Sequence, residues 1–170
     1  LDGAGALAVD YKLDISDRMP EPLRVGLQTC VPNTLERIAY FGKGPQENYS
    51  DRCEGAFLGL YRSTPEKFMH SYITPQENGN RCDVRWLSLT ASDGRGVQFV
   101  GAEPLSVSVW NCTQESLDKA RHSNEVEPLA DALTVNIDRT QTGVGGTDTW
   151  ILKARPSDQY RLLEKHYACR

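Results

Sequence analysis

The sequence lacks the features that mark membrane and nucleic-acid-binding proteins. Its longest apolar stretches are short pieces such as residues 55–60, whereas a membrane-spanning helix needs about 20 apolar residues. Asp and Glu together number 23 against 19 Lys and Arg, the net charge is −4, and there is no basic run. Nucleic acid and membranes are therefore not expected partners, because both would require a basic surface or a long apolar segment.

Motifs for metal, redox and hydrolytic chemistry are also lacking. The three histidines are far apart, the cysteines form no C-x-x-C pair, and no G-x-S-x-G or phosphate-loop lysine is present. The odd number of cysteines favours free, buried thiols, and one or two disulfides stay open if the protein is exported. The five are Cys30, Cys53, Cys82, Cys112 and Cys169.

No signal peptide is visible at the first residues, and the sequence starts with Leu1 rather than Met. We therefore expect this chain to be a piece of a longer protein. Its compartment stays open on the sequence alone.

What the sequence does contain is short strands and turns. Alternation of apolar and polar residues predicts strands over 6–15, 24–29, 35–41, 81–90, 97–100, 105–110 and 133–138. Asp93-Gly94 is a typical hairpin turn. One helix is predicted over 114–121, with Thr113 as its N-cap. The length fits one domain, 1–170, and the pattern favours an all-β sandwich.

Residues 143–150 read Gly-Val-Gly-Gly-Thr-Asp-Thr-Trp. Glycines at this density allow a tight, irregular loop, and a tryptophan ring is a large amphipathic surface. Two interpretations stay open from composition. The segment is either a hairpin turn with a core tryptophan or a recognition loop.

Two further loops, 44–52 and 74–81, both carry Pro-Gln-Glu-Asn followed by an arginine. Carboxylate, amide and guanidinium groups so close together can satisfy one another and the loop backbone. We expect an internal hydrogen-bonded brace, with a sugar site or an interdomain seam as the alternative. The residues concerned are Glu47, Asn48, Arg52, Glu77, Asn78 and Arg81.

Glycosidases use pairs of carboxylates, and Glu47, Glu77 and Asp148 are the candidates here. No spacing singles out two of them among the many acidic residues. The sequence therefore does not favour catalysis by this chain.

Taken together, the segments 44–52, 75–82 and 143–150 resemble a known family, and they occur in its order. The chain looks like the C-terminal small-chain domain of large bacterial β-galactosidases of glycoside hydrolase family 2. The hairpin after residues 86–90 and the helix ending at His122 fit as well, and the resemblance covers about residues 3–150. It implies an all-β, antiparallel two-sheet supersandwich, similar to galactose mutarotase, with one short helix.

The resemblance also implies a function for the parent enzyme, which is retaining hydrolysis of terminal β-D-galactosides. In this family the catalytic glutamates and the magnesium ligands lie on a barrel domain upstream. The chain is therefore expected to have no catalytic residue, metal site or cofactor of its own. Its expected partners are the galactoside and the other domains of the parent, which acts in the bacterial cytoplasm or periplasm and whose oligomeric state stays open.

One residue role is implied by the resemblance. The tryptophan that closes the glycine-rich loop, Trp150, is expected to contact the sugar at the mouth of the active site. Gly145, Gly146, Asp148 and the six polar loop residues are expected to shape that site. Two alternatives stay open, namely a free-standing carbohydrate-binding or structural module, and a mutarotase-like epimerase with a His/Glu pair in one cleft.

Overall fold

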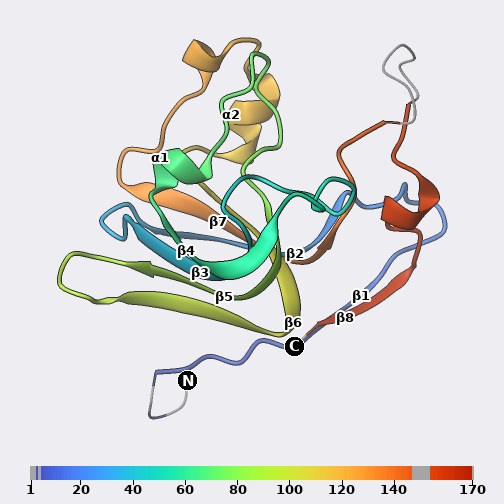
Figure 1. Cartoon of the computed structure of the whole chain (residues 1–170). Helices are drawn as coiled ribbons and strands as arrows, with labels where there is room; N and C mark the ends of the chain where they lie inside the picture. Colours follow the sequence, from blue (N-terminus) through green and yellow to red (C-terminus); the bar gives the residue numbers. More distant parts are fainter. Residues whose placement is uncertain (1–2, 4, 147–153, 170) are drawn as a thin grey trace.

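The chain folds into two antiparallel sheets of unequal size (Figure 1). A computed structural model describes residues 3, 5–146 and 154–169. The larger sheet has six strands, in the order β2 (Arg24–Pro32), β7 (Ala132–Gln141), β6 (Gly96–Trp110), β5 (Arg81–Thr90), β3 (Arg37–Gly44) and β4 (Phe57–Ser63). The smaller sheet pairs β1 (Tyr11–Asp14) with β8 (His166–Cys169). The prediction of an all-β fold with two antiparallel sheets is confirmed.

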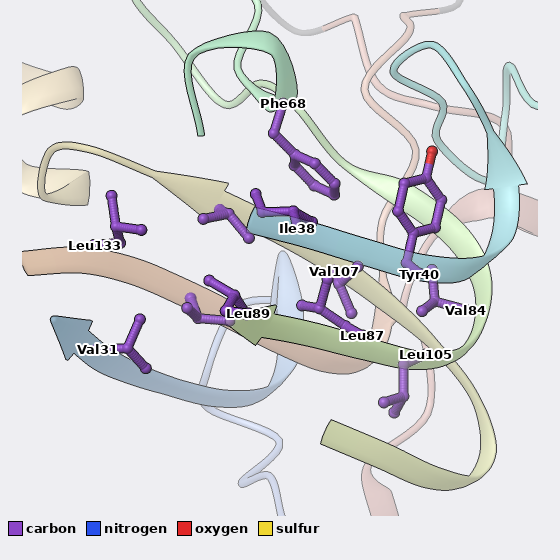
Figure 2. Packing of buried hydrophobic residues seen from close by; sticks show 12 residues of the cluster. Val31, Ile38, Tyr40, Phe68, Val84, Leu87, Leu89, Leu105, Val107 and Leu133 are labelled. Carbon is purple, nitrogen blue, oxygen red and sulfur yellow. The ribbon is translucent and has the colours of Figure 1, made fainter. Parts of the chain in front are cut away.

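The main core covers one face of the six-stranded sheet. Ile38 of β3 lies opposite Leu89 of β5, and Tyr40 lies opposite Leu87, so that alternate residues of both strands point the same way. Phe68, at the end of the short helix α1 (Pro65–Phe68), points from above the sheet toward Ile38 and Tyr40 (Figure 2). All five side chains are almost completely buried. The period-two pattern of the sequence is therefore the pattern of this core.

A second, smaller core lies under the helix α2 (Gln114–Lys119). Trp110, Cys112 and Leu117 are buried together there. Thr113 Oγ1 accepts a hydrogen bond from the Ser116 N–H at 3.1 Å, which confirms the predicted N-cap. Two 3₁₀ turns, η1 (Ser123–Glu125) and η2 (Asp158–Tyr160), complete the elements of the described residues. No helix among those residues is long and apolar enough to cross a membrane.

Several element boundaries differ from the sequence-based expectation. The segments 97–100 and 105–110 belong to one long strand, β6, whose register against β5 is irregular. The predicted strand 6–15 is shorter, since only Tyr11–Asp14 pairs as β1. β3 continues beyond the expected strand 35–41, through Gly42 to Gly44, which is the first residue of the expected loop 44–52. A Cβ at Gly42 would lie 2.7 Å from a Val84 methyl carbon, so these glycines permit close strand packing rather than a turn.

Neither the strand β4 nor the helix α1 was predicted. The strand β4 was not predicted because its apolar and polar residues do not alternate. Phe57, Leu58 and Leu60 are all exposed. The helix α1 was not predicted because it has a single turn, which begins at Pro65. The described part of the chain therefore has two short α-helices where one was expected.

The five cysteines are all free, as the sequence favoured. Only Cys82 and Cys112 are buried, and burial raises the pKa of each thiol to about 11. The expectation that the thiols are buried is wrong for Cys30, which is exposed, and only partly right for Cys53 and Cys169.

Candidate functional site

The two Pro-Gln-Glu-Asn loops lie against each other, although they are separated along the chain. The Asn48 N–H donates to the carbonyl oxygen of Asn80 at 2.9 Å. The Asn80 side-chain amide donates back to the Asn48 carbonyl, also at 2.9 Å. This reciprocal pair joins the first loop to the start of β5.

Asn48 is buried and uses both ends of its side chain to hold the first loop. Its Nδ2 donates to the carbonyl oxygens of Gln46 at 2.9 Å and Lys43 at 3.1 Å. Its Oδ1 accepts the Cys82 N–H at 2.9 Å. A buried amide thus closes its own loop and fixes the neighbouring strand.

Asn78 does the same in the second loop. Its Nδ2 donates to the Gln76 carbonyl at 2.9 Å, and its Oδ1 accepts the His70 N–H at 3.0 Å. The carbonyl oxygen of Asn78 accepts the indole N–H of the fully buried Trp110, at 2.9 Å. The second loop is therefore tied to the smaller core under α2.

Glu47 reaches from the first loop into the second. Its Oε2 accepts the Gly79 N–H at 2.5 Å, and its Oε1 accepts from the Arg52 guanidinium and the Tyr72 hydroxyl. The Glu47 side chain is 10% exposed, so its carboxylate is largely shielded from solvent. Both of its oxygens accept internal hydrogen bonds.

Glu77 reaches the other way, from the second loop toward the first. Its Oε1 accepts from the Tyr49 hydroxyl at 3.3 Å, and its Oε2 pairs with Arg24 at 3.2 Å. Arg24 also pairs with Asp138 of β7 at 2.6 Å. Burial raises the pKa of Glu77 and that of Asp138, and Arg24 opposes the shift in both.

Arg81 is a buried cation whose neighbours are mainly backbone carbonyls. It donates to the carbonyl oxygens of Pro45 at 3.0 Å, Gly79 at 3.0 Å and Asn80 at 3.2 Å. Its guanidinium lies 4.4 Å from the centre of the Phe68 ring. It makes no ion pair within the part of the chain that the structure describes. Arg81 therefore links both loops to the main core.

These contacts confirm the predicted internal brace. The structure brings together all six polar residues named from the sequence, and it adds Arg24, Tyr72 and Asp138, which the sequence did not point to. Arg24 and Asp138 are 114 positions apart, so no local pattern could have paired them. In the sequence, Tyr72 lies between the two loops and belongs to no motif.

The glycine-rich segment leaves the sheet beside the first loop. The Gly143 N–H donates to the Tyr160 carbonyl at 2.8 Å, and the Gly145 N–H donates to Asp51 Oδ2 at 2.7 Å. Gly145 and Gly146 are both exposed. Asp148 and Trp150 lie outside the described residues, so their expected roles stay predictions.

These features define an all-β domain in which polar loops brace one end of an antiparallel sheet and a glycine-rich segment leaves beside them. The sequence model of the family described as beta galactosidase small chain matches residues 1–170. The chain belongs to this family.

Similar curated proteins carry the name β-galactosidase. The chain is 38% identical to the β-galactosidase of Vibrio cholerae over 152 residues, which cover 89% of this chain and 14% of that protein. It is 32% identical to the β-galactosidase of Priestia megaterium, over 90% of this chain and 15% of that protein. It is 37% identical to β-galactosidase 2 of Enterobacter cloacae, over 92% of this chain and 14% of that protein. The chain thus spans about 15% of the length of the relatives it matches.

Proposed function

We propose that this chain completes the sugar-binding mouth of a β-galactosidase whose catalytic groups lie elsewhere in the longer enzyme. The parent would hydrolyse terminal, non-reducing β-D-galactosides with retention of configuration. The observation that carries the proposal is the Asp51–Gly145 hydrogen bond. It holds Gly145, which precedes Trp150 in the sequence, beside the braced loops of a domain from this family.

The contacts of the two loop glutamates support a non-catalytic role. Glu47 accepts three internal hydrogen bonds, and Glu77 is held by Tyr49 and Arg24. A catalytic acid or nucleophile needs a carboxyl oxygen directed at the substrate. Magnesium, which the family resemblance implies for the parent, would be held by the barrel domain upstream of this chain.

Trp150 is the residue proposed to contact the sugar. The aromatic ring would cover the apolar C–H face of a pyranose and leave its hydroxyls free for hydrogen bonds. Such a contact acts on binding more than on the chemical step, so it should appear in KM.

The test is Trp150→Ala in the full-length enzyme, assayed with several galactosides. We expect KM to rise about tenfold or more with a smaller change in kcat. Glu47→Gln and Glu77→Gln serve as comparisons, because losing a true acid–base catalyst costs about 10²–10⁴ in rate. Unchanged kinetics for Trp150→Ala would refute its proposed contact, and a loss of that size for either glutamine variant would refute the non-catalytic assignment.

A further inference from the structure

The six-stranded sheet carries an apolar row on the face that points away from the main core. Leu60 of β4 lies opposite Phe41 of β3. Phe41 also lies opposite Trp86 of β5, which in turn lies opposite Val100 of β6. Directly opposed residues share a face of the sheet, so these four side chains form one row across four strands. Tyr40, which precedes Phe41, belongs to the main core, so the apolar row lies on the other face.

Both ends of the apolar row are open to solvent in the described structure. Val100 is 68% exposed and Leu60 is 61% exposed. Leu58 is two residues before Leu60 and so lies on the same face, and it is also exposed. Phe41 and Trp86, between the ends, are partly buried. An antiparallel sheet that faces water on one side normally carries polar residues there, so an apolar row on this face marks a surface that another surface covers.

Elsewhere, the chain covers the outer face of this sheet itself. Val109 of β6 belongs to the main core, whereas its neighbour Trp110 lies on the other face and is buried with Leu117 of α2. The apolar row has no such cover. None of its four residues belongs to either core or packs against one, in the part of the chain that the structure describes.

Two arginines lie at one end of the apolar row. Arg62 of β4 lies opposite Ala39, which is two residues before Phe41 and therefore on the same face. Arg37 is two residues before Ala39 and shares that face as well. Both arginines are exposed, and neither forms an ion pair with a described residue. A surface that covers the apolar row would be complementary if it brought carboxylates to this end.

The same face of a second copy would not supply those carboxylates. β3, β4, β5 and residues 96–100 of β6 contain one acidic residue, Asp83, and its Oδ2 already lies 3.6 Å from Lys43 Nζ. The remainder of a longer enzyme is the other source. The match to the Vibrio cholerae β-galactosidase covers 14% of that protein, so most of such an enzyme lies outside this chain.

We propose that the outer face of β4, β3, β5 and the first part of β6 docks against another part of the same longer chain. The docked surface presents apolar side chains to the apolar row and carboxylates to Arg37 and Arg62. The inference rests on one part of the proposed function, namely that this chain belongs to a longer β-galactosidase. It does not need a sugar contact by this domain.

The first test measures whether the face is covered in the full-length enzyme. Val100→Cys and the control Asp93→Cys are treated with a maleimide, and labelling of each site is followed by peptide mass spectrometry, which separates it from the five native cysteines. Asp93 is exposed in the turn between β5 and β6, so both sites belong to one hairpin. We expect position 100 to react at least about tenfold more slowly than position 93 in the native enzyme, and equally fast in urea. Equal rates in the native enzyme would overturn the proposal.

The second test reverses the charge at the end of the apolar row. Arg62→Glu, added to Val100→Cys, would place a carboxylate against the carboxylates of the docked surface. We expect labelling at position 100 to become about tenfold faster or more, because like charges at an interface are costly. Arg121→Glu is the control, since Arg121 is also exposed but lies beyond α2 and outside this face. An equal effect of the two reversals, or no effect of Arg62→Glu, would overturn the assigned carboxylates.

The third test identifies the occupant. The photo-crosslinking residue p-benzoylphenylalanine is placed at position 60 of the full-length enzyme in place of Leu60. We expect a product with the mass of one chain, in which position 60 is joined to a peptide outside residues 1–170. A product with the mass of two chains would show that another copy covers the face and would overturn the proposal. Unchanged kinetics of Trp150→Ala would refute the proposed sugar contact and leave these three results unaffected.

Discussion

The two Pro-Gln-Glu-Asn loops have the same four residues and share only some of their contacts. In both, the asparagine Nδ2 donates to the carbonyl of the glutamine two positions earlier. The glutamates differ, because Glu47 binds an arginine of its own loop, whereas Glu77 pairs with an arginine that is distant in the sequence. Contacts within a loop follow from the motif, and contacts beyond it depend on what the fold brings near.

Replacing the arginine that follows each motif should give the largest difference in stability between the two loops. Arg81→Met would remove three hydrogen bonds to loop carbonyl oxygens from a buried side chain, and should cost about 3 kcal/mol of stability at roughly 1 kcal/mol for each bond. Arg52 is about half exposed, so Arg52→Met should cost less than about 1 kcal/mol. Urea unfolding of the two variants measures the difference, and equal losses would mean that burial does not distinguish them.

Replacing the asparagine of each motif should give a smaller difference in stability. Asn48 makes three side-chain hydrogen bonds with the protein and Asn78 makes two. We expect Asn48→Ala to cost about 3 kcal/mol and Asn78→Ala about 2 kcal/mol, at roughly 1 kcal/mol for each bond. The same unfolding experiment applies, and a larger loss for Asn78→Ala would reverse the ranking of the loops.

Glu77 should leave a signature in the pH dependence of stability. Burial raises its pKa above the ordinary value of 4.5, so the folded state binds this proton more tightly than the unfolded state. The stability due to the bound proton is present below pH 4.5 and is lost as pH rises through the raised pKa. Glu77→Gln should therefore gain stability relative to the parent sequence over that window.

Glu115 on α2 gives a control of opposite sign. Its hydrogen bond with Lys119 lowers its pKa, so its contribution is present above pH 4.5 and is lost as pH falls through the lowered value. Glu115→Gln should lose stability relative to the parent sequence with rising pH. Urea unfolding between about pH 3 and about pH 7 covers both windows, and trends of the same sign would contradict the assignment for Glu77.

Replacing the two tyrosines that donate hydrogen bonds to the glutamates should have the smallest effects on stability. Tyr72→Phe removes one of three donors to Glu47 and should cost about 0.5 kcal/mol. Tyr49→Phe removes a donor to Glu77 that lies on an almost completely buried side chain, and should cost about 1–1.5 kcal/mol. If thermal unfolding ranks Tyr72→Phe as the more damaging change, burial of the tyrosine does not determine the cost of losing its hydroxyl group.

The sequence predicted the features that depend on residues close together in the chain. The strand over 81–90, the Thr113 cap and the brace between the two loops follow from alternation, capping chemistry and a repeated motif. β4 could not be predicted, because its apolar residues are exposed and do not alternate. The sandwich class followed from the strand pattern, whereas the supersandwich and the role of Trp150 came from family resemblance.

The partners of Arg24 and Asp51 could not be predicted either. Each meets its partner across about a hundred residues, at a place fixed only when β2, β7 and the first loop assemble. A single sequence carries no signal for such pairs. These residues became visible only with the fold.

The small sheet of β1 and β8 has a consequence for how the molecule opens. It pairs Tyr11 with Cys169, which lie near the two ends of the sequence, and it shares no strand with the six-stranded sheet. A two-stranded sheet alone is only marginally stable in water. Its amides should therefore exchange with deuterium well before those of β5 and β6, in an opening that leaves the loop brace intact.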